Sequence, residues 1–202
     1  MKLYFSPGAC SLASHIALHE AGMNFEAIKV EGRGQKTAGG EDYLQITAKG
    51  YVPALKLDDG SVLTEGTAIL PYIGDLNPAL GLAPAPGTMA RYRMHEWLGY
   101  INSEVHKNFS PFFTPGTTDE QKAAAKANLS RRLGFIEAEM GTNSYLLGES
   151  FTVADAYLFT VLGWLGYVGM DLGQWPQLKA YHGRIAARPA VQAAMKAEGL
   201  IK

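Results

Sequence analysis

The 202-residue sequence contains a single cysteine, Cys10. One thiol excludes an intramolecular disulfide and a zinc site built from cysteines, so a redox reaction at Cys10 would need a second sulfur from another molecule. His15 and His19 are four residues apart, but the glutamate that a zinc-protease helix carries between such histidines is absent. We therefore expect no metal.

The sequence also lacks an excess of charge and lacks long apolar runs. A net charge of −1 gives no electrostatic reason to expect a nucleic-acid partner or an acidic membrane surface. No stretch reaches the roughly 18 uninterrupted apolar residues that a membrane span requires, and the first residues do not have the pattern of a signal peptide. We therefore expect a cytoplasmic protein. Its 202 residues, 47% of them hydrophobic, provide ample surface to bury in a core.

Cys10 lies where a predicted strand, Lys2 to Phe5, gives way to a predicted helix, Ser11 to about Ala21. Unpaired backbone N–H groups and the positive end of the helix dipole favour thiolate over thiol at such a position. A lone cysteine can equally be a small buried hydrophobe. The neighbouring residues leave both interpretations open, a reactive thiol and an apolar filler.

The first half, residues 1–77, has the pattern of a mixed α/β domain. Lys2 to Phe5 and Phe25 to Val30 are predicted strands joined through a helix, which makes a parallel βαβ unit. Ala54 to Leu57 and Ser61 to Thr64 flank an Asp-Gly turn and predict an antiparallel hairpin. The other predicted segments are a glycine-rich loop at 32–40 and helices at 41–46 and 65–76. We expect a four-stranded mixed sheet with helices packed on it.

The second half, residues 88–202, is predicted to be all-helical and follows a proline-rich linker at 78–87. The predicted helices are Thr88 to about Phe109, Asp119 to Met140, Val153 to Val168, Pro176 to Ala187 and Pro189 to Glu198. Thr152 suits an N-cap, and Asp155, three residues later, takes the reciprocal position of a capping box. We interpret this motif as part of the fold and not of the chemistry.

Three short motifs carry polar groups that suit a site. Val52-Pro53 precedes the hairpin, where a proline either marks a sheet edge or forms a cis peptide, as about 5–6% of X–Pro bonds do. Glu65-Gly66-Thr67 either belongs to a helix capped by Thr64 or offers a carboxylate and N–H groups to an amino-acid head group. Ser103, Glu104, His106 and Lys107 lie within one helical segment, and three of them (Ser103, His106 and Lys107) share a face by three-and-four spacing. That face is either a polar surface or one wall of a site.

Taken together, the motifs resemble a known family. The βαβ unit, the Val-Pro before a hairpin and the cysteine before the first helix resemble a thioredoxin-like domain, although Ala13 stands where the second redox cysteine would be. With the helical second half, the whole chain resembles the cytosolic glutathione S-transferases, and within them the bacterial beta class. The shared segments are Met1 to Tyr4, Pro7 to Leu12, Tyr51 to Pro53, Leu63 to Gly66, Ser103 to Lys107, Val153 to Phe159 and Ala197 to Lys202.

The resemblance implies roles for individual residues. Cys10 would lie beside the sulfur of glutathione, with His106 near it, as the two catalytic side chains. The backbone of Val52, with Pro53 in cis, would bind the cysteinyl part. The other residues implied to bind glutathione are Glu65 and Gly66 at the γ-glutamyl head, Gln35 at the glycyl carboxylate, and Ser103, Glu104, His106 and Lys107 from the helical domain. The family also implies a homodimer with the glutathione site near its interface.

Three positions depart from the pattern of the class. Gln35 stands where lysine is common; it can hydrogen-bond the glycyl carboxylate but brings no charge, and Lys36 beside it is an alternative cation. Gly99 stands in place of an asparagine and Phe5 in place of a tyrosine, which removes two polar groups near the site. We expect altered glutathione affinity or pocket shape, with the central thiol retained.

The leading hypothesis for function is glutathione transfer, in which the protein stabilises the glutathione thiolate and positions it against a hydrophobic electrophile. The electrophile would lie in a cleft between the domains, unless the aromatic side chains expected to line it belong to the core. These side chains are Tyr51, Phe109, Phe112, Phe113 and Trp164.

Two other hypotheses remain. Cys10 would form a mixed disulfide with glutathione in a thioltransferase or peroxidase, and an external thiol would resolve it. In a transferase without that thiol, Ser11 or Tyr4 would be the substitute hydroxyl donors to the glutathione sulfur. The third hypothesis is a non-catalytic scaffold that binds glutathione or another ligand on the same fold.

Overall fold

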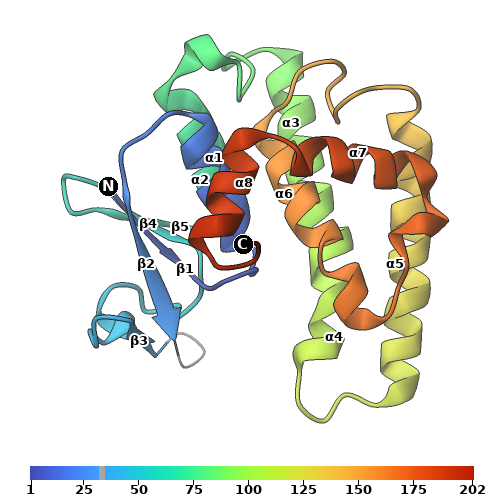
Figure 1. Ribbon diagram of the computed structural model, residues 1–202, viewed down its shortest axis with the longest axis horizontal. Coiled ribbons are helices and arrows are strands. Elements are labelled where there is room, and N and C mark those ends of the chain that lie inside the picture. Colours follow the sequence, from blue (N-terminus) through green and yellow to red (C-terminus); the bar gives the residue numbers. More distant parts are fainter. Residues whose placement is uncertain (32–34) are drawn as a thin grey trace.

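A computed structural model describes residues 1–31 and 35–202 (Figure 1). The helices and strands in chain order are β1 (Lys2–Phe5), α1 (Ser11–Glu20), β2 (Glu26–Glu31), β3 (Lys36–Thr37), β4 (Ala54–Lys56), β5 (Val62–Thr64), α2 (Gly66–Leu76), α3 (Met89–Tyr100), α4 (Ser110–Phe113), α5 (Asp119–Met140), α6 (Val153–Leu162), α7 (Pro176–Ala186) and α8 (Pro189–Ala197). The order of a mixed α/β half followed by helices is the predicted one.

The sheet has one strand more than the sequence predicts. Its order is β3-β2-β1-β4-β5, in which β1 and β2 are parallel and the other neighbours are antiparallel. The added strand, β3, pairs with the edge of β2 within the segment predicted as a loop at 32–40, of which 32–34 lie outside the described residues. Two residues are too few to show the alternation from which strands are predicted.

The central strand β1 is buried on both of its faces. On one face Leu3 and Phe5 of β1 join the main core beneath α1 and α2. On the other face Tyr4 packs with Val30 and Tyr43 in a smaller core. Burial on both sides fixes the position of β1 and therefore of the loop after it, which carries Cys10.

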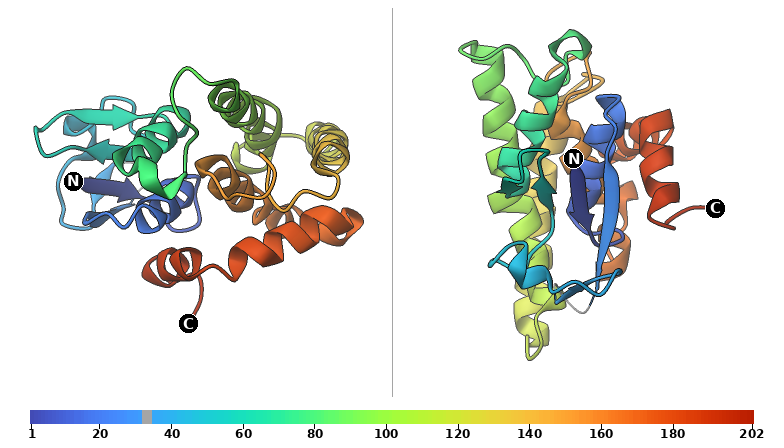
Figure 2. Two further views of the ribbon diagram at one scale, coloured as in Figure 1. Left: turned by 90° about the horizontal axis from the view of Figure 1, so that it is seen from above. Right: turned by 90° about the vertical axis from the view of Figure 1, so that its left-hand side faces the viewer.

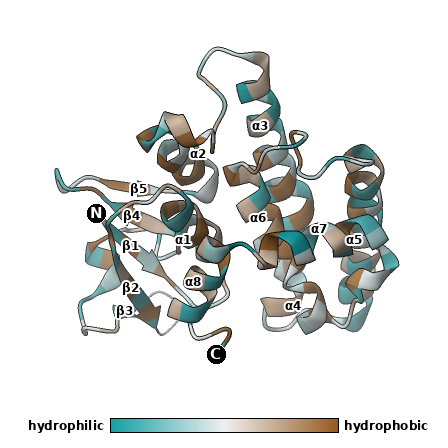
Figure 3. Ribbon diagram, turned by 45° about the horizontal axis from the view of Figure 1, so that its top comes forward, coloured by the Kyte–Doolittle hydropathy of each residue, from teal (hydrophilic) through white to brown (hydrophobic). Residues whose placement is uncertain are grey.

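The helical half is organised around α6, whose residues are all buried. Figure 3 shows this helix as a mainly hydrophobic segment among its neighbours. The predicted capping box is confirmed, because the Asp155 carboxylate accepts hydrogen bonds from the backbone N–H of Thr152 at 2.7 Å and from its hydroxyl at 2.9 Å. Leu146 N–H and the Tyr181 hydroxyl also donate to Asp155. Burial raises the pKa of Asp155, but four donors satisfy its oxygens.

The helix predicted from Thr88 to Phe109 is not continuous. It changes from the α-helix α3 to a π-helical turn at Ile101–Val105, then to a 3₁₀ turn at His106–Phe109 before α4. An apolar spacing of three and four residues does not reveal an extra residue in one turn, so this change of helix type could not be predicted from the residues alone. The segment predicted from Val153 to Val168 likewise breaks after Leu162 at the end of α6.

The last helix, α8, returns to the first half of the chain and packs on α1 (Figures 1 and 2). Glu198, just after α8, accepts hydrogen bonds from the backbone N–H of Gly8 at 2.9 Å and from Nδ1 of His15 at 2.9 Å. These bonds tie the loop before Cys10 to the helical half. Among the described residues, no helix is both long and apolar enough to cross a membrane.

Candidate active site

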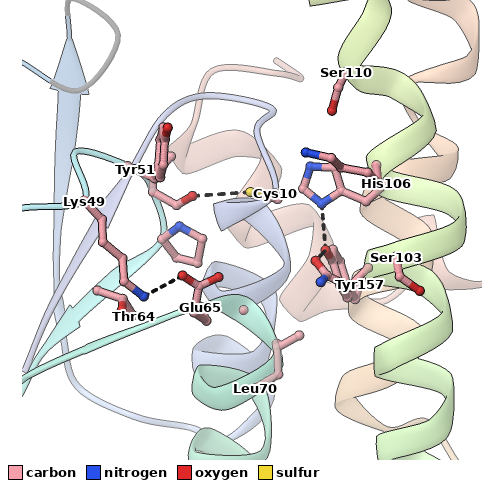
Figure 4. Close-up of a pocket in the computed structure, with 15 residues that line it drawn as sticks. Cys10, Lys49, Tyr51, Thr64, Glu65, Leu70, Ser103, His106, Ser110 and Tyr157 are labelled. Carbon is pink, nitrogen blue, oxygen red and sulfur yellow. Dashed lines mark hydrogen bonds and ion pairs between the residues drawn. The ribbon is translucent and has the colours of Figure 1, made fainter.

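A polar cleft of about 580 Å³ lies between the sheet half and the helical half, with Cys10 in its wall (Figure 4). The first half contributes the segments around Cys10, Val52 and Glu65, and the second contributes the irregular turns after α3. The residues that line this polar cleft are Cys10, Lys49, Tyr51, Val52, Pro53, Thr64, Glu65, Gly66, Leu70, Asn102, Ser103, His106, Lys107, Ser110 and Tyr157.

Cys10 is the N-cap residue of α1, as its position in the sequence predicts. Its Sγ donates a hydrogen bond to the carbonyl of Val52 at 3.4 Å. Burial raises the pKa of the thiol to about 11, although the backbone N–H groups of Cys10 and Ser11 act to lower it and the carboxylate of Glu65 raises it further. Of the two interpretations left open, the raised pKa favours the neutral thiol: desolvation outweighs the helix N-terminus, and Cys10 donates its hydrogen bond as a thiol.

The peptide bond between Val52 and Pro53 is cis, as the resemblance implied. This segment runs directly into β4, which is hydrogen-bonded to β1. The backbone of Val52 therefore lies beside the start of α1, where its carbonyl accepts the bond from Cys10.

Glu65 has a φ of 71°, the only positive φ among the described residues other than glycine. It is itself the N-cap residue of α2, so the alternative with Thr64 as N-cap is wrong. For a residue other than glycine, this backbone conformation costs about 1–3 kcal/mol, and residues that adopt it are concentrated at functional sites. The carboxylate points into the polar cleft, where Nζ of Lys49 donates to its Oε1 at 2.6 Å (Figure 4). Lys49 was not predicted as a site residue, because nothing in its sequence neighbourhood separates it from a surface lysine.

His106 reaches the polar cleft from the helical half, and Figure 4 shows its ring and the Cys10 sulfur directed into the same space. Its Nδ1 lies 2.7 Å from the hydroxyl of Tyr157, which in turn donates to Oδ1 of Asn102 at 3.0 Å. Burial, with a smaller effect of the Lys107 charge, lowers the pKa of His106 to about 4. His106 is therefore neutral at pH 7 and has one ring nitrogen free to accept a proton.

Two residues expected to bind glutathione are not among those that line the polar cleft. Gln35 is exposed on the loop before β3. Glu104 instead forms an ion pair with Arg132 of α5 at 2.7 Å. The other predicted positions, including Ser103 and Lys107, do line it.

The substitute hydroxyl donors are also outside the polar cleft. Ser11 is fully buried and exchanges hydrogen bonds with the backbone of Ser6. Tyr4 lies in the smaller core on the far face of the sheet. Neither hydroxyl lines the space that Cys10 faces.

A second, more aromatic cleft of about 700 Å³ adjoins the first and shares Cys10, Tyr51, His106, Lys107 and Ser110 with it. Of the aromatic residues predicted to bind an electrophile, four line this aromatic cleft: Tyr51, Phe109, Phe113 and Trp164. Phe112 does not, and Tyr167, which does, was missed. The Trp164 indole donates to the carbonyl of Gly8 at 2.8 Å and so fixes one wall beside Cys10.

The histidines of α1 have a structural setting. His15 is buried and bonded to Glu198, and its ring stacks on His19 at 5.2 Å between centroids. Within residues 1–31 and 35–202, no group of three or more His, Cys, Asp or Glu side chains is placed to hold a metal ion.

Comparison with known proteins gives consistent matches over both halves. Residues 8–76 match the family model described as "Glutathione S-transferase, N-terminal domain", and residues 100–189 match "Glutathione S-transferase, C-terminal domain". The chain is 44% identical to the glutathione S-transferase GstA of Escherichia coli O157:H7, covering 99% of this chain and all of that protein. A sphingomonad glutathione S-transferase solved with glutathione is 53% identical, with a TM-score of 0.95 and full coverage of both chains. The bacterial beta-class glutathione S-transferase of Sphingomonas chungbukensis is 51% identical, with a TM-score of 0.96 and full coverage of both chains.

Proposed function

We propose how individual side chains act in this chain, which belongs to the glutathione S-transferase family and, within it, to the bacterial beta class. The protein is an enzyme that conjugates the thiolate of glutathione to hydrophobic electrophiles. The observation that carries the residue assignment is the polar cleft, in which Cys10, Glu65 and His106 meet from three separate parts of the chain.

The γ-glutamyl head of glutathione would bind at the start of α2. Its ammonium would pair with the carboxylate of Glu65, which the positive φ of that residue directs into the polar cleft. Its α-carboxylate would accept from the backbone N–H of Gly66, at the positive end of the helix. Lys49, whose Nζ donates to the carboxylate of Glu65, would give way to the ammonium.

The cysteinyl part would bind along Val52, beside Pro53. The carbonyl of Val52 accepts from the Cys10 thiol, and the cysteinyl N–H of glutathione would replace that donor. Cys10 would then be free to donate its S–H to the glutathione sulfur, which stabilises the thiolate there. A thiol whose pKa lies near 11 is well suited to donate this bond, because it keeps its own proton.

The helical half would provide the groups that favour deprotonation of glutathione. Neutral His106 would take the thiol proton, and the positive charge of Lys107 would favour the resulting thiolate. Ser103 lines the same wall and would hydrogen-bond the peptide. We assign neither Gln35 nor Glu104 to the site of the same subunit, given where their side chains lie.

The electrophile would occupy the aromatic cleft, with its reactive carbon next to the glutathione sulfur. Tyr51, Phe113 and Tyr167 are largely exposed there, and burying them against an apolar substrate releases water from their surfaces. Cys10 and His106 line both clefts, which supports a reaction between a glutathione sulfur in the polar cleft and an electrophile in the aromatic cleft.

A mixed disulfide of Cys10 with glutathione is the second candidate reaction, because the thiol lines both clefts and is not engaged in another covalent bond. The raised pKa of Cys10 argues against it, since the thiolate is the attacking form.

The variant Cys10→Ala separates the two reactions. We expect it to bind glutathione in calorimetry with an affinity within a few-fold of the wild type and to retain conjugation of 1-chloro-2,4-dinitrobenzene, while glutathione-dependent disulfide exchange disappears. Loss of conjugation with intact glutathione binding, not restored by the hydroxyl donor of Cys10→Ser, would assign Cys10 a covalent role in transfer. Absence of glutathione binding by the wild-type protein would refute the site assignment as a whole.

We also propose that the protein is a homodimer through the face shared by α3 and α5. Trp97, Tyr100 and Phe135 cluster there, with centroids 5.1–6.4 Å apart, and Phe135 is half-exposed. Trp97 and Tyr100 are half-buried beside it, and an aromatic cluster that is partly exposed in this way suits an interaction site. Light scattering of the wild type should give twice the mass of the chain, and Phe135→Glu should give the monomer.

A cytoplasmic location follows as a proposal from the chemistry. Glutathione must be present as its thiol, and Cys10 must stay reduced, which a reducing compartment ensures. Cell fractionation with an antibody to the protein would test this location.

A further inference from the structure

A chain of hydrogen bonds runs behind the proposed proton acceptor, from His106 through Tyr157 to Asn102. We propose that Tyr157 and Asn102 are positioning residues that hold His106 as the tautomer protonated at Nδ1, so that Nε2 accepts the thiol proton of glutathione. This inference rests on the proposed function of the site. Neither residue was identified from the sequence, where Tyr157 reads as core and Asn102 as surface.

The direction of the bonds follows from counting protons. The phenol of Tyr157 has a single O–H, which it donates to Oδ1 of Asn102 at 3.0 Å. Its oxygen can then only accept from His106, so the 2.7 Å contact requires a proton on Nδ1. A neutral imidazole has one ring proton, and Nε2 is therefore left with its lone pair.

The imidazole ring is held in place from two sides. Tyr157 is 3% exposed, and its ring meets His106 edge-on at 5.9 Å between centroids. On the other side Trp164 packs at 4.8 Å and 70° to the His106 ring, and its own indole is fixed by the carbonyl of Gly8. The ring has little freedom to turn over and exchange its nitrogens.

The proton acceptor faces the space that the substrate sulfur would occupy. His106 lines both the polar and the aromatic cleft, and in the part of the chain that the structure describes its Nε2 forms no hydrogen bond. Burial raises the pKa of Tyr157 well above its usual value. The phenol therefore stays protonated throughout and orients His106 without taking its proton.

The step is balanced without a further reactant. The S–H bond of glutathione breaks, its proton forms a bond to Nε2 of His106, and the electron pair stays on sulfur. That sulfur forms a bond to the electrophilic carbon, which expels its leaving group with the bonding pair. The imidazolium then returns its proton to water, and the chain from Tyr157 to Asn102 restores the same tautomer.

Tyr157→Phe and two substitutions of Asn102 test the chain. Tyr157→Phe removes one oxygen and keeps the packing of the ring. We expect kcat to fall roughly tenfold, which is less than the roughly 10²–10⁴ of a full general acid–base contribution because His106 itself remains, while KM for glutathione stays within twofold. Asn102→Ala frees the phenol to donate to Nδ1, which selects the wrong tautomer and should lower kcat similarly. Asn102→Asp keeps an oxygen that can only accept and should keep the wild-type tautomer.

Nitrogen-15 spectra of histidine-labelled protein report the tautomer directly, with His106→Asn identifying the signal. We expect Nδ1 protonated in the wild type and Asn102→Asp, the Nε2-protonated form in Asn102→Ala, and a mixture in Tyr157→Phe. A wild-type His106 protonated at Nε2, or wild-type kcat in both Tyr157→Phe and Asn102→Ala, would overturn the inference. If Tyr157→Phe does not fold, the two variants of the exposed Asn102 decide it.

Failure of the proposed positioning role of Tyr157 and Asn102 and failure of the proposed function give different results. Wild-type protein that neither binds nor conjugates glutathione refutes the function, whatever the spectra show. If the wild type conjugates glutathione and neither Tyr157→Phe nor Asn102→Ala changes kcat, only the positioning role of Tyr157 and Asn102 is refuted. The double variant Tyr157→Phe/Asn102→Ala should be no slower than Tyr157→Phe alone, since both residues act through one bond to His106.

Discussion

Two carboxylates, Glu198 and Glu65, each join distant parts of the chain, and they do so in opposite surroundings. Glu198 lies 2.9 Å from Nδ1 of His15, and the two side chains are 0% and 1% exposed. Glu65 lies 2.6 Å from Nζ of Lys49, and these side chains are 62% and 51% exposed. Both carboxylates lie near the cysteine loop: Glu198 is bonded to the loop itself at Gly8, and Glu65 lines the polar cleft together with Cys10.

The difference in exposure indicates that the bonds of Glu198 must remain intact in the folded protein, whereas Glu65 can exchange Lys49 for another partner. Glu198 cannot lose its partners without leaving buried polar groups unpaired, because its other oxygen accepts from the backbone of Gly8. Glu65 can leave Lys49 at little cost, because water replaces either partner and exposed ion pairs contribute about 0–1 kcal/mol. The buried bond therefore serves the fold, and the exposed one suits a residue that must accept a ligand.

The largest expected effect comes from breaking the buried bond. Glu198→Ala leaves His15 and the N–H of Gly8 without an acceptor, and we expect the free energy of unfolding to fall by about 3–5 kcal/mol. Urea denaturation measures this loss. Glu96→Ala, which removes an exposed pair with Arg93, is the matched control and should cost under about 1 kcal/mol. Equal losses in the two variants would contradict the distinction between buried and exposed bonds.

The second effect concerns His106, which faces the same cleft as Glu65 but is mostly buried. Its pKa in the folded protein is about 4, below the value of 6.5 expected when unfolded, so the unfolded chain binds more protons between these pH values. Stability must therefore rise as pH rises from 4 to 6.5, and His106 should contribute about 1–3 kcal/mol to that rise.

The test is urea denaturation of the wild type and of His106→Asn between pH 4 and pH 7.5. The dependence on pH should be shallower in the variant, and the two curves should run parallel above pH 6.5. Parallel curves across the whole range would contradict the buried, neutral state of His106.

The third effect removes the charge of the exposed carboxylate. Glu65→Gln should lower glutathione affinity roughly 10- to 100-fold in calorimetry, because hydrogen bonds to charged groups contribute about 1.5–3 kcal/mol. Its stability should stay within about 1 kcal/mol of the wild type. A variant that unfolds as readily as Glu198→Ala would show that Glu65 serves the fold after all.

The smallest effect comes from the lysine of the exposed pair. Lys49→Met should change the free energy of unfolding by less than about 1 kcal/mol and should change glutathione affinity by only a few-fold. Paired with Glu65→Gln, it tests whether Lys49 only pairs with the carboxylate of Glu65 and does not itself bind glutathione. A loss of affinity as large as that of Glu65→Gln would instead make Lys49 a direct ligand.

Most of the fold could be predicted from the sequence, because the signals that mark its helices, strands and turns are local. The Asp-Gly turn predicted the β4–β5 hairpin, and Thr152 with Asp155 predicted the start of α6. What it missed depends on contacts between distant residues or on very short segments. The π-helical turn at Ile101–Val105 has no apolar period of its own, and β3 exists only through its pairing with β2.

The site was predicted unevenly for the same reason. Cys10 and Glu65 stand in recognisable motifs, and both lie in the polar cleft. The sequence left the ionisation of Cys10 open, because the burial that raises the pKa of its thiol is a property of the folded chain. Lys49 and Tyr157 have no local signal: one reads as a surface lysine and the other as part of an apolar helix, and only the folded arrangement brings them to the cleft.

The hydrogen bond between the backbone N–H of Gly8 and Glu198 also has a consequence for folding during translation. The two residues are 190 positions apart, so the sheet half is synthesised long before the carboxylate that anchors its cysteine loop. Domains generally begin to fold as they emerge, and residues 1–77 can assemble their sheet early. The loop that carries Cys10 nevertheless acquires its final anchor only when Glu198, just after α8, has been translated, so a nascent chain has no finished reaction centre before that point.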